Sequence, residues 1–326
     1  MYVKGDIVKF CDKEYGFFKR DVQNYQINGS NIDLLVNVDD SQILPIRPKG
    51  ANAGIKLILD EEPKQLYYNS SVSPDFCLQW IEALFWWDDK CMIHAAAIAK
   101  GNQSYLLCAP ANTGKTSCVL ELIKEGWEYL GDDWIIVGNN KIYSFPKTIH
   151  IFDYNIVYDK EYFTKYYRIK KPMYLYSKLQ FFIKKQIIKR VPSRFLRYGI
   201  NKILSRPLYY LKVNEILPKI SIADYKPIDK VFFLQRQNCD KICINPIDIS
   251  EIINKICHIL LVERAYFLNW YYLYAALEKE IFYIESWREH YSKVLSQTLK
   301  NTIPIKVLIP LKGNPKDIVK VIKSIN

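Results

Sequence analysis

The chain has 326 residues, of which 49% are hydrophobic and 14% aromatic, and it carries a formal net charge of +12. This composition excludes an intrinsically disordered chain, and the length exceeds that of one average domain. No apolar run reaches the roughly 18 residues that a membrane-spanning helix requires, and the first residues lack the apolar stretch of a signal peptide. The eight cysteines are scattered, which is typical of buried thiols in a reducing compartment. We therefore expect a cytoplasmic globular protein.

The positive charge is concentrated in one segment of the chain. Residues 160–214 contain 15 Lys or Arg and a single acidic residue, Glu161, whereas the other residues contain 31 basic and 33 acidic side chains. The net charge is therefore +14 in this basic segment and −2 in the rest of the chain. The positive field belongs to one segment and not to the whole surface.

The N-terminal part of the chain combines short apolar runs with turn residues. Asn28-Gly29 and Lys49-Gly50 separate these runs, so we expect a small β-rich region over residues 1–73. Residues 74–88 begin with a proline and an acidic residue and carry apolar side chains at helical spacing, which predicts a helix. This helix would open a second domain over residues 74–326, with the basic segment at about 160–214 as an insertion.

The middle of the chain alternates between strands and helices. "CMIHAAAIA" (91–99) predicts a buried strand, residues 100–103 a tight turn, and "SYLLCA" (104–109) the next strand. A helix is expected over 115–125, with Gly126 at its end. "WEYLGDDWIIV" (127–137) is extended and apolar, and two aspartates interrupt it.

The last third of the chain continues this alternation. Residues 230–236 predict a strand that returns to the sheet, residues 250–277 a helix, and "PIKVLIPL" (304–311) another strand. Asn314 and Pro315 are typical of the cap and first turn of a final helix. The pattern as a whole predicts an α/β (α+β) fold with a mixed sheet.

The stretch "CAPANTGKTS" (108–117) predicts a phosphate-binding loop between a strand and a helix. Such loops usually have the pattern G-x-x-x-x-G-K-[ST], and here Ala109 takes the place of the first glycine. Consecutive backbone N–H groups at the start of a helix bind anions, and Asn112 tolerates the left-handed backbone that this geometry needs. The predicted nucleotide-binding residues are Ala109, Asn112, Thr113, Gly114, Lys115, Thr116 and Ser117.

Two further features flank this loop. Asp132 and Asp133 follow Lys115 at the end of an apolar run, where a carboxylate can reach Mg²⁺ or an attacking hydroxyl beside a γ-phosphate. His94 lies on the preceding strand. On its own, His94 would be read as a core histidine, and the aspartate pair would fit a solvated turn equally well.

Together, these elements resemble the catalytic domain of HPr kinase/phosphorylase and its wider HPr-kinase-like relatives. The family pattern is a strand with His-Ala, a hairpin, a phosphate loop, a helix that ends in glycine, and an Asp-Asp pair. This chain has "IHAAAIAKGNQSYLLCAPANTGKTS" followed by "LIKEGWEYLGDDWIIV", and "YSFPKTIHIF" (143–152) is similar to the proline-containing strand that comes next. The resemblance covers residues 90–152 and extends more weakly through 226–236 to the C-terminal helices.

The resemblance implies a fold shared with phosphoenolpyruvate carboxykinases, and transfer of the γ-phosphoryl group of ATP to a hydroxyl with the help of Mg²⁺. GTP is an alternative donor. Lys115 would bind the β- and γ-phosphates, Thr116 would hold Mg²⁺, and Asp133 would assist the metal. Asp132 would be the general base, and His94 would line the acceptor side. The acceptor would be a serine of a peptide or protein, or a small molecule. The family also suggests a homo-oligomer.

The alternative interpretation of the same residues is a nucleotide-binding sensor or scaffold protein without catalysis. The replacement of the usual loop glycines by Ala109 and Asn112 favours it, whereas the intact Lys115-Thr116 and the aspartate pair favour the kinase.

The basic segment has several interpretations. It could be a packed helical insertion, a lid that brings Arg194, Arg197 or Arg206 to the phosphates, or a docking surface for an acidic acceptor. A membrane surface and nucleic acid rank lower, because no nucleic-acid-binding motif accompanies the charge. Cys239 and Cys243 lack the second pair of ligands that a zinc site would require.

Overall fold

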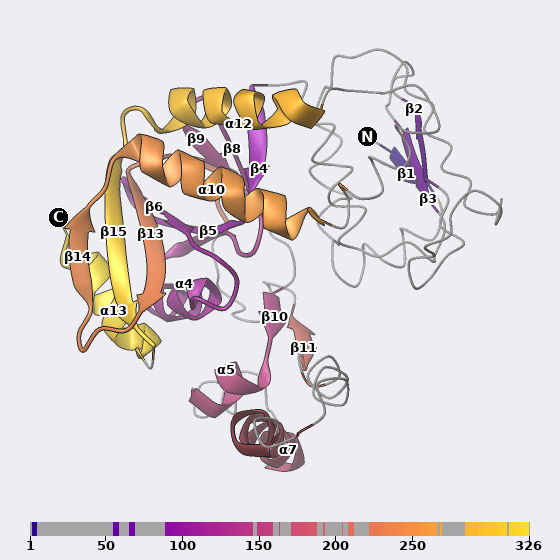
Figure 1. Cartoon of the computed structure of the whole chain (residues 1–326). Helices are drawn as coiled ribbons and strands as arrows, with labels where there is room; N and C mark the ends of the chain where they lie inside the picture. The colour runs from indigo at the N-terminus through magenta and orange to yellow at the C-terminus, as the bar shows by residue number, and fades with distance from the viewer. Residues whose placement is uncertain are drawn as a thin grey trace. The chain divides into compact units, whose positions relative to one another are not determined.

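The computed structural model describes the chain in parts and divides it into two compact units (Figure 1). The core unit comprises Met1–Pro146 and Ser221–Asn326, and the second unit comprises Lys147–Ile220. The described residues are 2–4, 55–58, 65–68, 89–145, 149–158, 163, 171–187, 192, 204, 208–211, 222–265, 268, 284–311 and 313–325.

Three short strands are described in the N-terminal region: β1 (Tyr2–Lys4), β2 (Ile55–Ile58) and β3 (Gln65–Tyr68). They form a sheet in the order β1-β3-β2, with β1 parallel and β2 antiparallel to β3. The other residues of the predicted β-rich region over 1–73 lie outside the described residues. The predicted helix at 74–88 lies outside the described residues.

The main sheet of the core unit is mixed and has six strands in the order β14-β15-β13-β6-β5-β7. Strand β13 runs parallel to both β6 and β15, whereas β5 is antiparallel to its neighbours β6 and β7, and β14 is antiparallel to β15. The bounds are β5 (Ala95–Lys100), β6 (Gln103–Cys108), β7 (Glu128–Gly131), β13 (Lys230–Gln237), β14 (Cys243–Pro246) and β15 (Ile303–Pro310).

A second, antiparallel sheet has four strands in the order β12-β9-β8-β4. Its strands are β4 (Lys90–Ile93), β8 (Ile135–Gly138), β9 (Lys141–Tyr143) and β12 (Tyr225–Pro227). The sequence predicts one strand over 91–99, but the chain forms two strands there, one in each sheet. His94 stands at the break between them. Local apolar character could not reveal this break, because both halves are equally buried.

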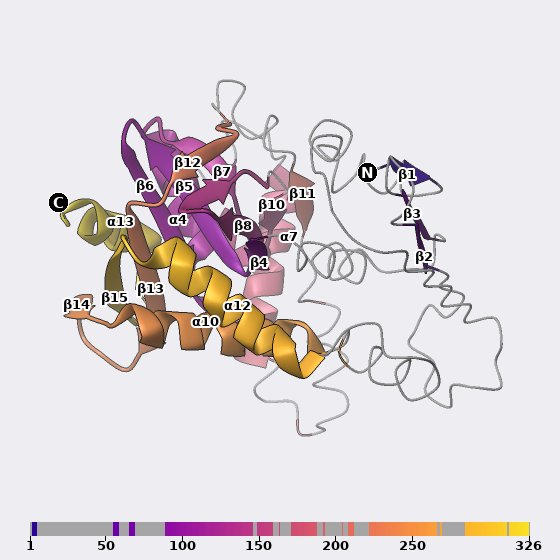
Figure 2. The ribbon, with the colours of Figure 1, turned by 90° about the horizontal axis from the view of Figure 1, so that it is seen from above.

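Helices cover both faces of the main sheet. Helices α4 (Lys115–Lys124) and α13 (Pro315–Lys323) pack together on one face, and α10 (Ile249–Glu263) lies on the other (Figures 1 and 2). Helix α12 (Ile284–Leu299) packs beside α10 and against β4 and β8. Because the central strands are covered on both faces, β5 and β6 read as continuous apolar runs without alternation.

Local chemistry sets the helix ends as the sequence predicts. Gly126 follows α4 with φ 81°, the left-handed conformation that ends many helices. Asn314 caps α13 by accepting a hydrogen bond from the backbone N–H of Lys316 at 3.0 Å, and Pro315 occupies the first turn. The predicted strands at 104–109, 230–236 and 304–311 and the helix at 115–125 are all present. The predicted helix at 250–277 is described over α10.

The second unit contains a two-stranded antiparallel sheet of β10 (Ile149–Ile151) and β11 (Tyr209–Leu211). Helix α5 (Asp153–Tyr158) packs against α7 (Lys171–Phe182), and a π-helical turn (Ile183–Ile187) extends α7. Lys184 on this turn forms an ion pair with the buried Asp153, at 2.7 Å.

The architecture is therefore a mixed α/β fold, as the sequence predicts at that level. Within the described part of the chain, none of the helices combines the length and apolar character that crossing a bilayer requires.

Candidate functional site

The candidate site lies where the chain crosses between the two sheets of the core unit. The first crossing, from β4 to β5, contains His94, and the second, from β7 to β8, contains Asp132 and Asp133. Pairing of β4 with β8 and of β5 with β7 holds the two crossings against each other, because Ile93 pairs with Ile135 and Ala97 with Gly131. Residues that are far apart in the sequence thus meet at one edge of the sheets.

The loop between β6 and α4 contains two residues in the left-handed backbone conformation. Asn112 adopts φ 61°, the left-handed conformation that the sequence predicts for it, and Gly114 has φ 113°. The hydroxyl of Thr113 donates a hydrogen bond to the carbonyl of Pro110 at 2.8 Å and fixes the turn. Ala109 takes the position of the usual first glycine and is fully buried at the start of the loop. Its methyl group is therefore accommodated within the packed structure.

Lys115 is buried under this loop. Its ammonium donates hydrogen bonds to the carbonyls of Ala109 (2.8 Å) and Pro110 (3.2 Å). Burial lowers the pKa of Lys115, and the carboxylates of Asp133 and Asp132 oppose this shift. The ammonium therefore lies in the field of both acids, as the sequence-based prediction requires.

Asp132 is a buried carboxylate beside the start of α4. Burial, and then the neighbouring Asp133, raise its pKa to about 6, while a hydrogen bond from the Thr116 hydroxyl and the charge of Lys115 act in the opposite direction. Its Oδ1 atom accepts no hydrogen bond from any described residue. A buried carboxylate oxygen without a partner is costly, so this atom is well suited to a bound proton, hydroxyl or cation.

Asp133 lies against His94. Its backbone has φ 75°, an uncommon conformation for aspartate that is typical of functional turns. Its Oδ1 lies 3.2 Å from Nε2 of His94, whose Nδ1 lies 3.1 Å from Oε1 of Glu263, although this second contact is not a well-aligned hydrogen bond. The imidazole also contacts the ring of Trp134, with 5.7 Å between centroids.

Asp133 and Glu263 favour the protonated, charged form of the buried His94. Burial opposes the charged imidazole, but Asp133 and Glu263 outweigh it and raise the pKa of His94, against a smaller opposing effect of Lys115. In return, the contact with His94 lowers the pKa of Glu263. Asp133, His94 and Glu263 therefore form a row of coupled charges beside Asp132.

Two residues of the site were not among those predicted from the sequence. Glu263 is the last residue of α10, far from the loop in the chain, and no local motif marks it. Arg236 on β13 is the other. A Cβ atom on Gly114 would stand 3.6 Å from Nη2 of Arg236, and Nη1 donates to the carbonyls of Pro310 (2.9 Å) and Leu311 (3.1 Å). The only available signal for Arg236 was its place at the end of a strand predicted to return to the sheet.

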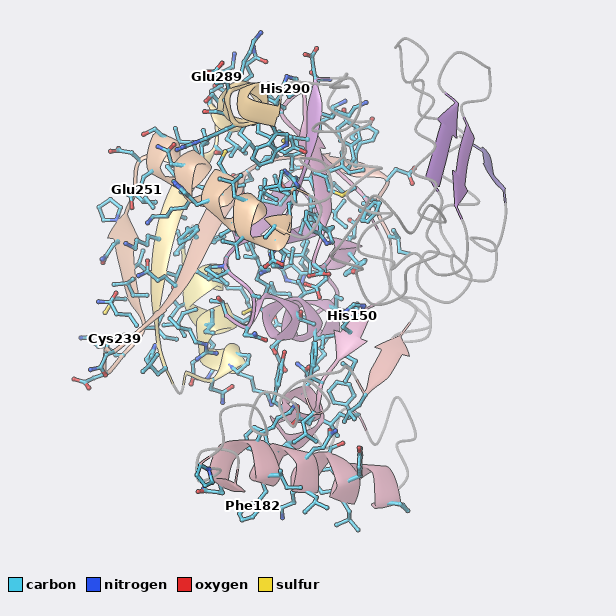
Figure 3. The ribbon with its side chains drawn as sticks, turned by 45° about the vertical axis from the view of Figure 1, so that its right-hand side comes forward. His150, Phe182, Cys239, Glu251, Glu289 and His290 are labelled. Atoms are coloured by element: carbon cyan, nitrogen blue, oxygen red, sulfur yellow. The ribbon has the colours of Figure 1, made fainter. Side chains whose placement is uncertain are left out.

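The structure brings together the predicted residues of the loop, His94 and both aspartates. It pairs Thr116 with Asp132, whereas the sequence groups Thr116 with Asp133 as metal ligands. No group of three or more His, Cys, Asp or Glu side chains with metal-binding geometry occurs in the described ranges. Cys239 and Cys243 are free thiols, and Cys239 lies at the periphery of the core unit (Figure 3). Arg194, Arg197 and Arg206 lie outside the described residues.

A comparison of the chain with protein-family models and with curated proteins found no match.

The pKa of Asp132 makes the stability of the fold depend on pH. Because this pKa is raised from 3.8 to about 6 in the folded state, the folded protein binds the proton more tightly than the unfolded chain does. The ionised carboxylate therefore destabilises the fold increasingly as the pH rises from 3.8 to about 6. Above this range the destabilisation is complete. We expect Asp132→Asn to stabilise the protein more at about pH 7.5 than at about pH 5, by on the order of 1 kcal/mol of unfolding free energy.

Thermal and denaturant unfolding at the two pH values measures this difference, with Asp317→Asn on the exposed surface of α13 as the matched control. If Asp132→Asn raised the unfolding free energy equally at both pH values, or more at the lower one, the raised pKa could not belong to this carboxylate.

Glu263 should control the ionisation of His94. In Glu263→Gln, the removal of one flanking negative charge should lower the pKa of the His94 imidazole, because burial and Lys115 then meet less opposition. A pH titration of the histidine ring signals by NMR, without nucleotide or metal, measures the shift, and His94→Gln assigns the signal. Glu251→Gln is the control, since Glu251 lies on the same helix and pairs with Lys255. An unchanged pKa in Glu263→Gln would remove Glu263 from the site.

Proposed function

We propose that this protein is an ATP- and Mg²⁺-dependent kinase of the HPr-kinase-like type, which transfers the γ-phosphoryl group to a hydroxyl of a peptide, protein or small-molecule acceptor. The proposal includes the fold shared with phosphoenolpyruvate carboxykinases. One observation carries it: a buried lysine and a buried carboxylate with an unsatisfied oxygen flank a left-handed loop at the start of a helix. Phosphoryl transfer needs mainly positioned charges, so this small set is chemically sufficient.

The loop and α4 would bind the triphosphate. The N-terminus of a helix favours anions, and the left-handed residues Asn112 and Gly114 turn the backbone of the loop toward a concave arrangement of N–H groups. Lys115 would exchange its hydrogen bonds to the two loop carbonyls for contacts to the β- and γ-phosphates. Arg236, which is held by two backbone carbonyls beside Gly114, adds a second positive charge on this side.

The oxygen atoms beside the loop fit Mg²⁺, which prefers hard oxygen ligands and keeps several waters. Thr116 and Asp133 would hold the ion, directly or through its waters, together with the phosphates. When bound, Mg²⁺ would neutralise charge on the phosphate oxygens. This donor set suits a metal that arrives with the nucleotide, since two protein ligands are enough in such sites.

Asp132 would accept the proton of the acceptor hydroxyl. The oxygen of that hydroxyl forms a bond to the γ-phosphorus as the bond from the γ-phosphorus to the bridging oxygen breaks, and ADP leaves. A base with a pKa of about 6 is mostly ionised at neutral pH and still binds a proton usefully. The partly exposed Asp133, fixed by His94, would border the path of the acceptor.

The proposal predicts two different losses. Lys115→Ala should abolish binding of ATP and Mg²⁺, because the ammonium that neutralises the phosphates is gone. Asp132→Asn should keep nucleotide affinity but lower phosphoryl transfer by at least about 100-fold. Isothermal calorimetry measures binding, and transfer of radiolabelled γ-phosphate to a library of serine-containing peptides, or to the protein itself, measures turnover. Lys124→Ala is the control, because Lys124 lies on the same helix and its ammonium pairs with Glu121.

Each alternative gives a distinct result. Transfer that is undiminished in Lys115→Ala would end the assignment. Loss of nucleotide binding in Asp132→Asn would indicate that Asp132 holds the metal instead of acting as the base. Binding of ATP by the wild type with no transfer to any acceptor, and no phosphate release, would support a nucleotide sensor or scaffold.

A further inference from the structure

Helix α7 in the second unit carries an exposed apolar stripe. Leu175, Tyr176, Leu179 and Phe182 have relative exposures of 62%, 49%, 55% and 54%. Leu175, Leu179 and Phe182 follow one another at the spacing of a single helix face, and Tyr176 is adjacent to Leu179 on the same side. Phe182 projects outward from the helix (Figure 3). The other exposed large apolar side chains of the described residues are scattered over separate elements of the core unit.

The opposite side of α7 is packed within the second unit. Ser177 and Gln180 are almost completely buried, and Lys184 on the following turn reaches the buried Asp153 of α5. The half-buried Tyr174 and Phe181 also lie on this side, so polar and aromatic side chains are packed while Leu175, Leu179 and Phe182 stay exposed. An apolar stripe that stays outside the packed structure indicates a surface that contacts something else.

The segment of the chain that carries the stripe is positively charged. Residues 171–187, which form α7 and the π-helical turn, contain four lysines and no acidic residue, and the surrounding segment 160–214 has a net charge of +14. Lys178 lies within the stripe and is exposed. A cationic helix with leucine and aromatic residues on its outer face is typical of helices that lie in the interface of an anionic bilayer.

We propose that the outer face of α7 binds an anionic membrane surface. The helix would lie flat, with its leucine and aromatic side chains in the headgroup region and Lys178 beside lipid phosphates. A protein partner fits less well, because four half-exposed side chains offer on the order of 400 Å², about half of what one partner contributes to a stable protein interface. A bilayer needs no such area, since the charge of the segment adds its own attraction.

Co-sedimentation of the full chain with lipid vesicles tests this proposal. The protein should bind vesicles of phosphatidylcholine mixed with phosphatidylglycerol, bind pure phosphatidylcholine vesicles much less, and lose binding as the salt concentration rises. The triple variant Leu175→Gln/Leu179→Gln/Phe182→Gln should lower the partition coefficient at least about tenfold, because it removes the inserted apolar surface and leaves the charge unchanged. Circular dichroism checks that the variant is folded.

The matched control is Tyr225→Gln/Ile244→Gln/Ile303→Gln, which changes three apolar side chains of similar exposure on strands of the core unit. It should bind vesicles like the wild type, and so should Lys115→Ala, because the surface does not depend on the proposed nucleotide chemistry. Three results would overturn the proposal: no binding to anionic vesicles, equal binding to both lipid compositions, or full binding by the stripe variant. A concentration-dependent dimer that only the stripe variant loses would likewise overturn it and identify a second copy of the chain as the occupant.

Discussion

The burial of Lys115 next to Asp132 is the constraint on which the site depends. An ammonium and a carboxylate are both costly to remove from water, and here the pKa of each is shifted toward its neutral form by burial. The loop carbonyls and the Thr116 hydroxyl offset part of this cost, but one oxygen of Asp132 keeps no partner among the described residues. A fold that needed only stability would fill this position with apolar side chains. The cost is consistent with a site that keeps charges ready for a ligand.

The two crossings between the sheets bring the residues of the site close to one another. A strand that continued straight through His94 would carry the imidazole into a single sheet, away from the aspartates. Instead, β4 and β5 separate at His94, β7 and β8 separate at the aspartate pair, and the antiparallel register brings these breaks together. The end of α10 then places Glu263 against the imidazole. The left-handed backbone of Asp133 is strain of the kind that packed surroundings hold at functional turns.

The second unit and the core unit differ in where their apolar side chains lie. In the core, apolar side chains on both faces of the main sheet are covered by helices. In α7, leucine and aromatic side chains stay exposed within a strongly cationic segment. The same chain thus carries a polar site enclosed by an apolar core and an apolar stripe enclosed by positive charge. Packing alone favours neither buried polar groups nor exposed apolar ones. The polar site and the apolar stripe are therefore both candidates for function.

The sequence by itself determined the features that depend on neighbouring residues. The loop with its left-handed Asn112, the helix that follows it, the glycine at the end of that helix, the cap at Asn314 and strands β6, β13 and β15 of the main sheet all depend on local backbone preferences and apolar patterns. Only the tertiary structure decided that residues 91–99 form two strands in different sheets, that Glu263 and Arg236 join the site, and that α7 exposes its apolar side. These features depend on strand register and on contacts between distant segments, and a local pattern contains no information about which distant partner will be closest.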